Sequence, residues 1–264
     1  MEKIRISIVK YANSYPFLWG LKEGLRDDEA EITTDHPAVC ASKMAEGKAD
    51  IGLMPVAALP EVKDYRIISD YCIGAFKKVR TVMLLSNSNF EDIHTIWLDY
   101  RSRSSVTLAR VLAAYMWKKE FRWNNTSEGF DFVNIPENHA VVLIGDQCFE
   151  YEPRFKFGLD LAEEWKKYTG FGFVFACWAA NREINSCFLK KFNSALKYGL
   201  ENIDKVVQAF SSSRVMNGKT LKNYLEQNID YIFDDSKKKG MELFLGMAKS
   251  IPQQDYYYDA GSRL

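Results

Sequence analysis

The spacing of apolar side chains alternates between strand and helix patterns along most of this chain. Residues 4–9 alternate as a strand, and residues 15–25 place Leu18, Leu21 and Leu25 on one helical face. Further strands are expected at 31–34, 50–54, 66–68, 81–85, 95–100, 130–134, 140–144 and 171–179. Helices are expected at 38–46, 56–59, 104–120 and 159–168, and from 186 to about 249. This order predicts an α/β fold with largely parallel sheets and a helical C-terminal segment.

A polar break at residues 86–89, Ser-Asn-Ser-Asn, divides the strand and helix pattern into two series. We therefore expect two lobes, with residues 1–86 and 180–264 in the first and residues 87–179 in the second. Ligands of open α/β sheets bind at strand carboxyl ends and helix starts, so the expected site is the cleft between the lobes.

Two polar clusters stand where a strand runs into a helix. Asn13 and Ser14 follow the first strand, and the run Arg101-Ser102-Arg103-Ser104-Ser105 follows the strand at 95–100. Backbone N–H groups at a helix start favour an anion, and hydroxyl side chains add donors. Two such starts suit a small acid with two carboxylates, although ordinary helix capping also explains Asn13 and Ser14.

Three further residues are candidates because of their place next to strand ends. Pro55 follows Gly52 just past a strand, where backbone can approach a ligand, although a tight turn explains it equally well. Thr81 opens a strand beside the expected crossing between lobes and could hydrogen bond a ligand. Asp146 ends another strand and is a candidate base, with a helix cap as its alternative.

Composition excludes several classes of function. The 264 residues carry 35 basic and 35 acidic side chains without a long basic stripe, which argues against a nucleic-acid partner. Apolar runs are too short to cross a membrane, and the start lacks the pattern of a signal peptide, so a cytoplasmic protein is expected. The five cysteines are scattered and the three histidines lack zinc-site spacing, so no metal is predicted. The pair Gly170 and Gly172 lacks the third glycine of a dinucleotide site.

Four segments carry a resemblance to a known family. They are Val9-Lys10-Tyr11-Ala12-Asn13-Ser14-Tyr15-Pro16, residues 49–57 (ADIGLMPVA), residues 68–75 (ISDYCIGA) and residues 98–106 (LDYRSRSSV). In this order they resemble the motifs of chorismate dehydratases, the family that begins the futalosine route to menaquinone. The likeness runs from about residue 4 to residue 180 and continues more weakly through the helical tail.

The resemblance implies a two-lobed fold like that of type 2 periplasmic binding proteins and catalysis without a cofactor. Two positions depart from the family pattern: Ala12 stands where many members carry leucine, and Thr81 where serine is frequent. A sister family on this fold, the 1,4-dihydroxy-6-naphthoate synthases, relies on a histidine that aligns near Gly145 and Asp146. This chain has no histidine there, which favours the dehydratase.

For the site, the resemblance implies conversion of chorismate to 3-enolpyruvylbenzoate with loss of water. Ser102, Arg103, Ser104 and Ser105 would bind one carboxylate, with Ser14 and Pro55 also at the substrate, while Asn13 and Thr81 face the reacting ring. The base is either Asp146 or the substrate's own enolpyruvyl carboxylate. A non-catalytic small-acid binding protein and the sensing part of a regulator are the competing hypotheses, and the oligomeric state is left open.

Overall fold

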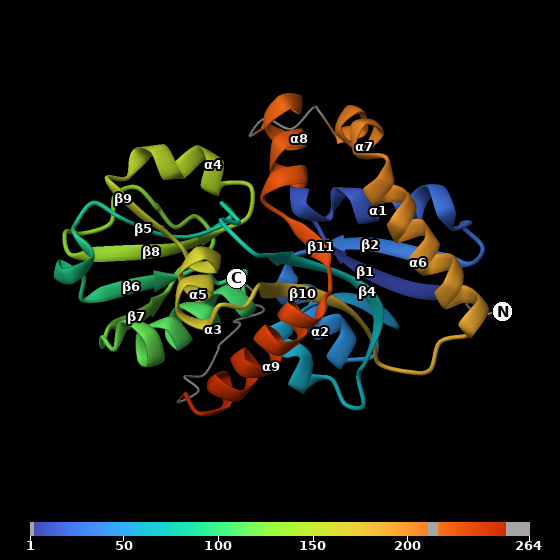
Figure 1. Cartoon of the computed structure of the whole chain (residues 1–264), viewed down its shortest axis with the longest axis horizontal. Coiled ribbons are helices and arrows are strands. Elements are labelled where there is room, and N and C mark those ends of the chain that lie inside the picture. The colour runs from blue at the N-terminus through green and yellow to red at the C-terminus, as the bar shows by residue number, and fades with distance from the viewer. Residues whose placement is uncertain (1–2, 211–215, 252–264) are drawn as a thin grey trace, which may run out of the picture.

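The chain folds into two lobes, each built on its own β-sheet (Figure 1). The computed structural model describes residues 3–210 and 216–251. The first sheet has the order β11-β4-β10-β3-β1-β2, with bounds Asp230–Ile232, Arg66–Ala75, Phe173–Ala180, Ile51–Pro55, Ile4–Val9 and Ala30–Asp35. The second has the order β7-β6-β8-β5-β9, with bounds Arg122–Asn125, Thr95–Leu98, His139–Ile144, Val82–Ser86 and Phe157–Asp160.

Both sheets are mixed rather than largely parallel. In the first, β1 pairs in parallel with β2 and β3, whereas β10 runs antiparallel between β3 and β4. In the second, β6 pairs in parallel with β7 and β8, whereas β5 runs antiparallel to β8 and β9. The α/β class is therefore confirmed. The antiparallel strands β5 and β10 are those next to the crossings between lobes.

The strands also correct both predicted lobe boundaries, at 86/87 and 179/180. Strand β5 (Val82–Ser86) lies in the second sheet, so the chain crosses between Ala75 and Val82 rather than after residue 86. Strand β10 (Phe173–Ala180) lies in the first sheet, so the return precedes Phe173. The polar break at 86–89 is a loop inside the second lobe, because the wholly buried β5 pairs on both of its edges there.

Helices flank the sheets, and the C-terminal helices pack mostly on the first lobe (Figure 1). Helix α1 packs closely on α6, since a Cβ added at Gly199 would lie 1.8 Å from the Pro16 carbonyl oxygen. Helix bounds are α1 Tyr15–Gly24, α2 Pro37–Ala45, α3 Ser104–Val111, α4 Cys148–Tyr151, α5 Leu161–Thr169, α6 Ser186–Glu201, α7 Ile203–Phe210, α8 Gly218–Gln227 and α9 Asp235–Lys249. Short 3-10 turns add η1 Ala12–Ser14, η2 Val56–Glu61, η3 Phe90–Asp92 and η5 Glu152–Arg154.

Local structure differs from the sequence expectation at several places. The strand expected at 130–134 is a loop, whose Phe130 and Phe132 rings pack against Trp97 and Tyr151. The strands β7, β9 and β11 were not expected. The helix expected at 104–120 ends as α3 at Val111 and continues as one π-helical stretch, η4 (Leu112–Trp117).

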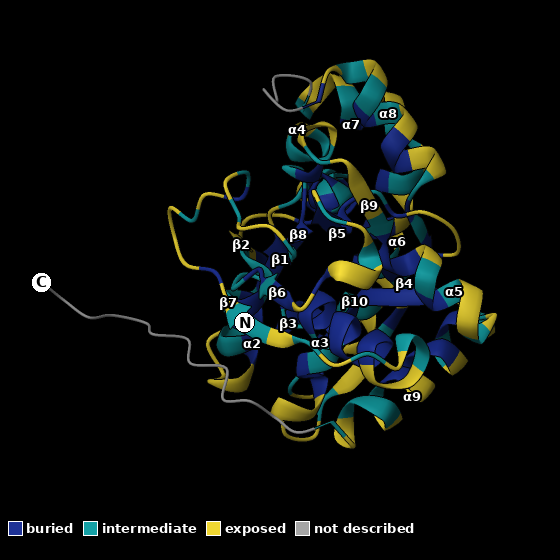
Figure 2. Cartoon of the chain, turned by 90° about the vertical axis from the view of Figure 1, so that its left-hand side faces the viewer, coloured by how far each residue is buried: buried dark blue, intermediate teal, exposed yellow. Residues whose placement is uncertain are grey.

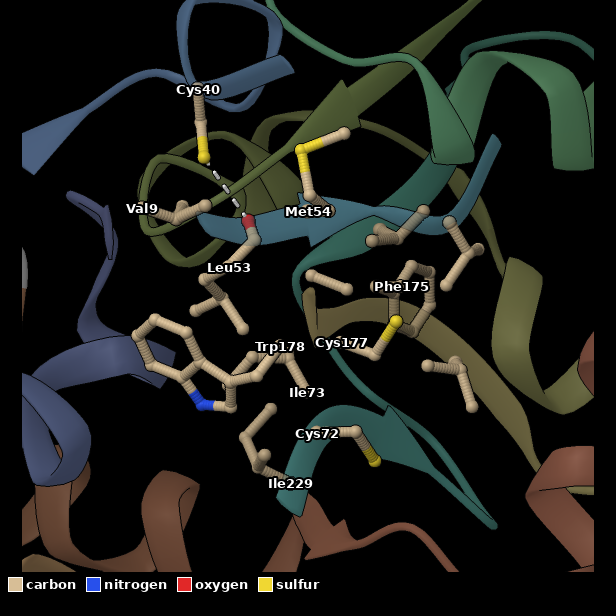
Figure 3. Packing of buried hydrophobic residues seen from close by; sticks show 14 of the residues in the cluster. Val9, Cys40, Leu53, Met54, Cys72, Ile73, Phe175, Cys177, Trp178 and Ile229 are labelled. Atoms are coloured by element: carbon tan, nitrogen blue, oxygen red, sulfur yellow. Dashed lines mark hydrogen bonds between the residues drawn. The ribbon is translucent and has the colours of Figure 1, made fainter. Parts of the chain in front are cut away.

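The hydrophobic core lies along the strands, with exposed residues on the outer helix faces (Figure 2). In the first lobe Val9, Ile73, Phe175 and Trp178 pack from neighbouring strands (Figure 3). Within this packing the Cys40 thiol donates to the Leu53 carbonyl at 3.4 Å. The strands that form this core end at the cavity described next. Their packing in the core therefore fixes the position of the residues at these strand ends. In the described part of the chain no helix is long and apolar enough to span a bilayer.

Candidate functional site

A cavity lies where the two sheets meet, with an empty volume of about 510 Å³ that includes its open mouth. Residues from both lobes line it: Val9, Tyr11, Asn13, Pro37, Pro55, Ile73, Val79, Thr81, Val82, Ser102, Ser104, Ser105, Ile144, Gly145, Phe175 and Ala176. The cavity therefore brings together six of the nine residues expected at the site, namely Asn13, Pro55, Thr81, Ser102, Ser104 and Ser105.

Asn13 enters the cavity from the 3-10 turn η1, which joins β1 to α1. Its Oδ1 accepts a hydrogen bond from the Ser14 hydroxyl at 3.2 Å. Ser14 itself is fully buried and is not among the described lining residues, so its position supports Asn13 rather than a direct ligand contact. The amide group of Asn13 also carries the donor Nδ2.

The serines at the start of α3 line the other side of the cavity and also form hydrogen bonds within the protein. The Ser102 hydroxyl accepts from the Ser105 backbone N–H at 3.1 Å and so caps the helix. The Ser104 hydroxyl donates to the Phe175 carbonyl at 2.9 Å and accepts from the Ala57 N–H at 3.3 Å. The positive end of the α3 dipole faces the cavity, as expected for an anion site.

The arginines of this run do not line the cavity. Arg103 lies 3.8 Å from the carboxylate of Glu61, which is not among the described lining residues. The Arg101 guanidinium bonds the fully buried Asp99 carboxylate through Nε at 2.8 Å and NH2 at 2.5 Å. Burial lowers the pKa of Arg101, but its bonds to Asp99 outweigh burial and raise it above the ordinary value. Both arginines thus pair with protein carboxylates rather than pointing at a ligand.

Thr81 and Pro55 occupy the cavity wall at strand ends. Pro55 ends β3, and Thr81 directly precedes β5. The Thr81 hydroxyl is 2.8 Å from the hydroxyl of Tyr224, which comes from helix α8 in the C-terminal segment. No feature of the local sequence indicated this partner, since 143 positions separate the two residues.

Asp146 is placed beside the cavity but is turned toward the backbone. Its Oδ1 and Oδ2 accept from the Ala12 N–H at 3.0 and 3.2 Å, a contact that joins the end of β8 to the first lobe. Burial raises the pKa of Asp146 to about 6, although the bond from Ala12 opposes this rise. Gly145, just before it, adopts a positive φ of 75° and lines the cavity.

Sequence reasoning did not select the aromatic wall of the cavity. The Tyr11 ring packs on Gly145 so tightly that an added Cβ there would lie 2.7 Å from Cε1. The Tyr11 hydroxyl is 3.4 Å from His36 Nδ1. Burial raises the pKa of Tyr11 and lowers the pKa of His36, so both groups are held neutral. Tyr11 lies inside the first motif, residues 9–16, and its place in that motif is the one sequence feature that indicates a position at the site.

The described lining residues include no charged side chain. An acid in this cavity would therefore be held by N–H and hydroxyl donors and by the helix start, against an apolar wall. Among the described residues no group of three or more histidine, cysteine or acidic side chains is arranged to hold a metal ion. The arrangement suits a small anionic organic molecule.

Comparison with known structures identifies the fold. Protein AF1704 from Archaeoglobus fulgidus superposes with a TM-score of 0.73 at 16% identity, covering 94% of this chain and 97% of that chain. A Candida albicans gene product with the generic periplasmic binding protein fold gives 0.68 at 13% identity, covering 97% and 92%. The aliphatic sulphonate binding protein SsuA from Escherichia coli gives 0.60 at 13%, covering 94% and 91%. The expected periplasmic-binding-protein-like fold is thus confirmed.

Comparison with protein families gives a match that extends over nearly the whole chain. Residues 4–250 match a family described as menaquinone biosynthesis. The match includes all nine expected site residues and the helical tail.

Proposed function

The chain belongs to the menaquinone-biosynthesis family, and on that premise we propose that it is a chorismate dehydratase, which converts chorismate to 3-enolpyruvylbenzoate and water. The observation that carries the proposal is the cavity itself. It joins Asn13 and Thr81 to Ser102 and Ser105 at the α3 start, about ninety residues along the chain from Asn13. Chorismate has two carboxylates on a small ring framework, and the cavity offers uncharged donors beside an apolar wall.

The reaction needs removal of a ring proton and departure of the neighbouring hydroxyl. The ring carboxylate acidifies the proton at the carbon that bears the enolpyruvyl ether, and loss of hydroxide then makes the ring aromatic. In our proposal the α3 start holds the ring carboxylate and stabilises the charge that develops on it. Asn13 Nδ2 and the Thr81 hydroxyl face the ring and donate to the departing oxygen.

For the base we propose the substrate's own enolpyruvyl carboxylate. The described lining residues carry no carboxylate, amine or imidazole, and both Asp146 oxygens are directed at the Ala12 N–H. The protein's contribution is then to hold the conformer in which the side-chain carboxylate reaches the ring proton. Asp146 becomes a contact between the lobes rather than an acid or base.

Incubation of the purified protein with chorismate tests the proposal, with a product lighter by one water as the expected result. Asn13→Ala should lower kcat by about 100-fold, the range for a donor that acts in the transition state. Asn134→Ala, on an exposed loop of the second lobe, is the matched control and should keep full activity. Asp146→Asn should retain most of the turnover, and a complete loss in this folded variant would restore Asp146 as the base. Chorismate retained unchanged by the wild type would instead favour the binding protein.

A further inference from the structure

Two tyrosine hydroxyls from the C-terminal segment reach the cavity residues from behind. Tyr224 in α8 lies 2.8 Å from Thr81 Oγ1, and Tyr231 in β11 donates to the Asn13 carbonyl at 3.0 Å. Their residues are 1% and 8% exposed, and neither is among the described residues that line the cavity. Helix α8 also packs against η1, the turn that carries Asn13. The same segment therefore contacts polar residues from both sides of the site.

We propose that Tyr224 is a positioning residue that fixes the Thr81 hydroxyl as a hydrogen-bond donor toward the cavity, an inference that rests on the proposed function. Tyr231 has the matching task for the backbone that carries Asn13. Both act through another residue, since neither is among the described residues that line the cavity.

The direction of the Tyr224–Thr81 bond follows from the acidity of the two hydroxyls. Either hydroxyl could donate across the 2.8 Å between them; because a phenol is the more acidic group, we assign Tyr224 as the donor and Thr81 Oγ1 as the acceptor. The Thr81 hydrogen then has two acceptors within reach, the Val79 carbonyl and a ligand oxygen in the cavity, and the incoming bond from Tyr224 polarises it as a donor. In the structure the Thr81 hydroxyl donates to the Val79 carbonyl at 3.5 Å, and a ligand oxygen has to replace this long hydrogen bond.

The surroundings of Tyr224 hold the phenol in place and keep it protonated. Its ring packs edge-on against Phe149 with centroids 5.3 Å apart. Burial raises the pKa of Tyr224 well above the ordinary value, and the nearby Asp146 carboxylate adds to the rise. Tyr224 therefore does not give up its proton during turnover. It orients and polarises Thr81, whose hydroxyl stabilises the departing oxygen.

The central experiment compares Tyr224→Phe with wild type, since phenylalanine keeps the ring packing and removes the hydroxyl alone. We expect kcat for chorismate to fall about tenfold, the effect of one hydrogen bond, with KM changed less than about twofold. In a Thr81→Ala background the same substitution should cause no further loss, because Tyr224 acts through Thr81. Tyr198→Phe, which alters a tyrosine 41% exposed and stacked on Trp19, is the control and should match wild type.

An unchanged kcat in Tyr224→Phe, or an equal loss in the Thr81→Ala background, overturns the inference. A crystal structure of Tyr224→Phe gives a readout that does not depend on the substrate. We expect Thr81 Oγ1 to move closer to the Val79 carbonyl oxygen than its present 3.5 Å, and an unmoved Thr81 side chain also overturns the inference. A wild-type protein without dehydratase activity would refute the proposed function alone, since this structural comparison still decides the role of Tyr224.

Discussion

Replacing Asp146 by asparagine should remove a pH dependence from the stability of the protein. Burial raises the pKa of Asp146 from 3.8 to about 6. The folded chain thus binds this proton more tightly than the unfolded chain. The resulting stabilisation is complete below about pH 4 and is lost as the pH rises through about 6. At about 1.4 kcal/mol for each pH unit, the rise in pKa corresponds to about 3 kcal/mol.

Urea unfolding followed by tryptophan fluorescence, from about pH 4 to about pH 8, measures this contribution. The difference in unfolding free energy, Asp146→Asn minus wild type, should increase by about 3 kcal/mol as the pH rises from about 4 to about 8. Asparagine keeps an oxygen that can accept from Ala12, so the bond between the lobes persists. Burial also raises the pKa of Asp160 to about 6, but Asp160 is present in both proteins and cancels in the difference.

A difference between variant and wild type that stays constant with pH would refute the reasoning. Asp131→Asn serves as the control, because Asp131 is exposed and its pKa is lowered by the Asn134 side chain. A lowered pKa contributes stability that is present at high pH and lost on acidification. The control should therefore show no gain on wild type as the pH rises.

Three substitutions test the packing around the site. Gly145→Ala should lower the free energy of unfolding by about 1–3 kcal/mol and weaken ligand binding, because φ is 75° and the Tyr11 ring blocks the new methyl group. The control is Gly129→Ala, where φ is 79° but the new methyl group meets nothing, and it should cost less stability in urea unfolding. Gly199→Ala should lower Tm by several degrees, because a proline carbonyl lies 1.8 Å from the added Cβ, while Gly246→Ala meets nothing and should not lower it. Lys237→Met should destabilise by about 1 kcal/mol, because it removes the ion pairs with two partly exposed aspartates, Asp230 and Asp234; an unchanged denaturation midpoint would contradict this.

Elements with a strong local pattern could be predicted from the sequence. The alternation at 4–9 and the helical face of Leu18 and Leu21 correspond to β1 and α1 almost residue for residue. The sequence pattern does not predict strand β9, because the strand is short and its Phe157 is 44% exposed, so no run of buried residues marks it. The expected strand at 130–134 failed because Phe130 and Phe132 bury their rings against a sheet face without backbone pairing.

The candidate site was predicted where chemistry and position coincide. Asn13, Thr81 and the serines stand at strand ends or helix starts, and such ends gather at one cavity in this class of fold. Arg103 and Asp146 are not among the described lining residues, and each side chain has a protein partner far along the chain. Contacts of this kind depend on how the lobes meet, and no local pattern reports them.

The hydroxyl of Ser104 fastens the start of α3 to Phe175 and Ala57 in the first lobe, although this helix follows a strand of the second. Separation of the lobes must break the Ala12–Asp146 contact, whereas the α3 start can stay where it is. An anion would then bind first at the α3 start, which stays attached to the first lobe, and the Gly145 side of the cavity would close over it afterwards. Such an order of events lets the charged end of a ligand be captured before the reacting ring is enclosed.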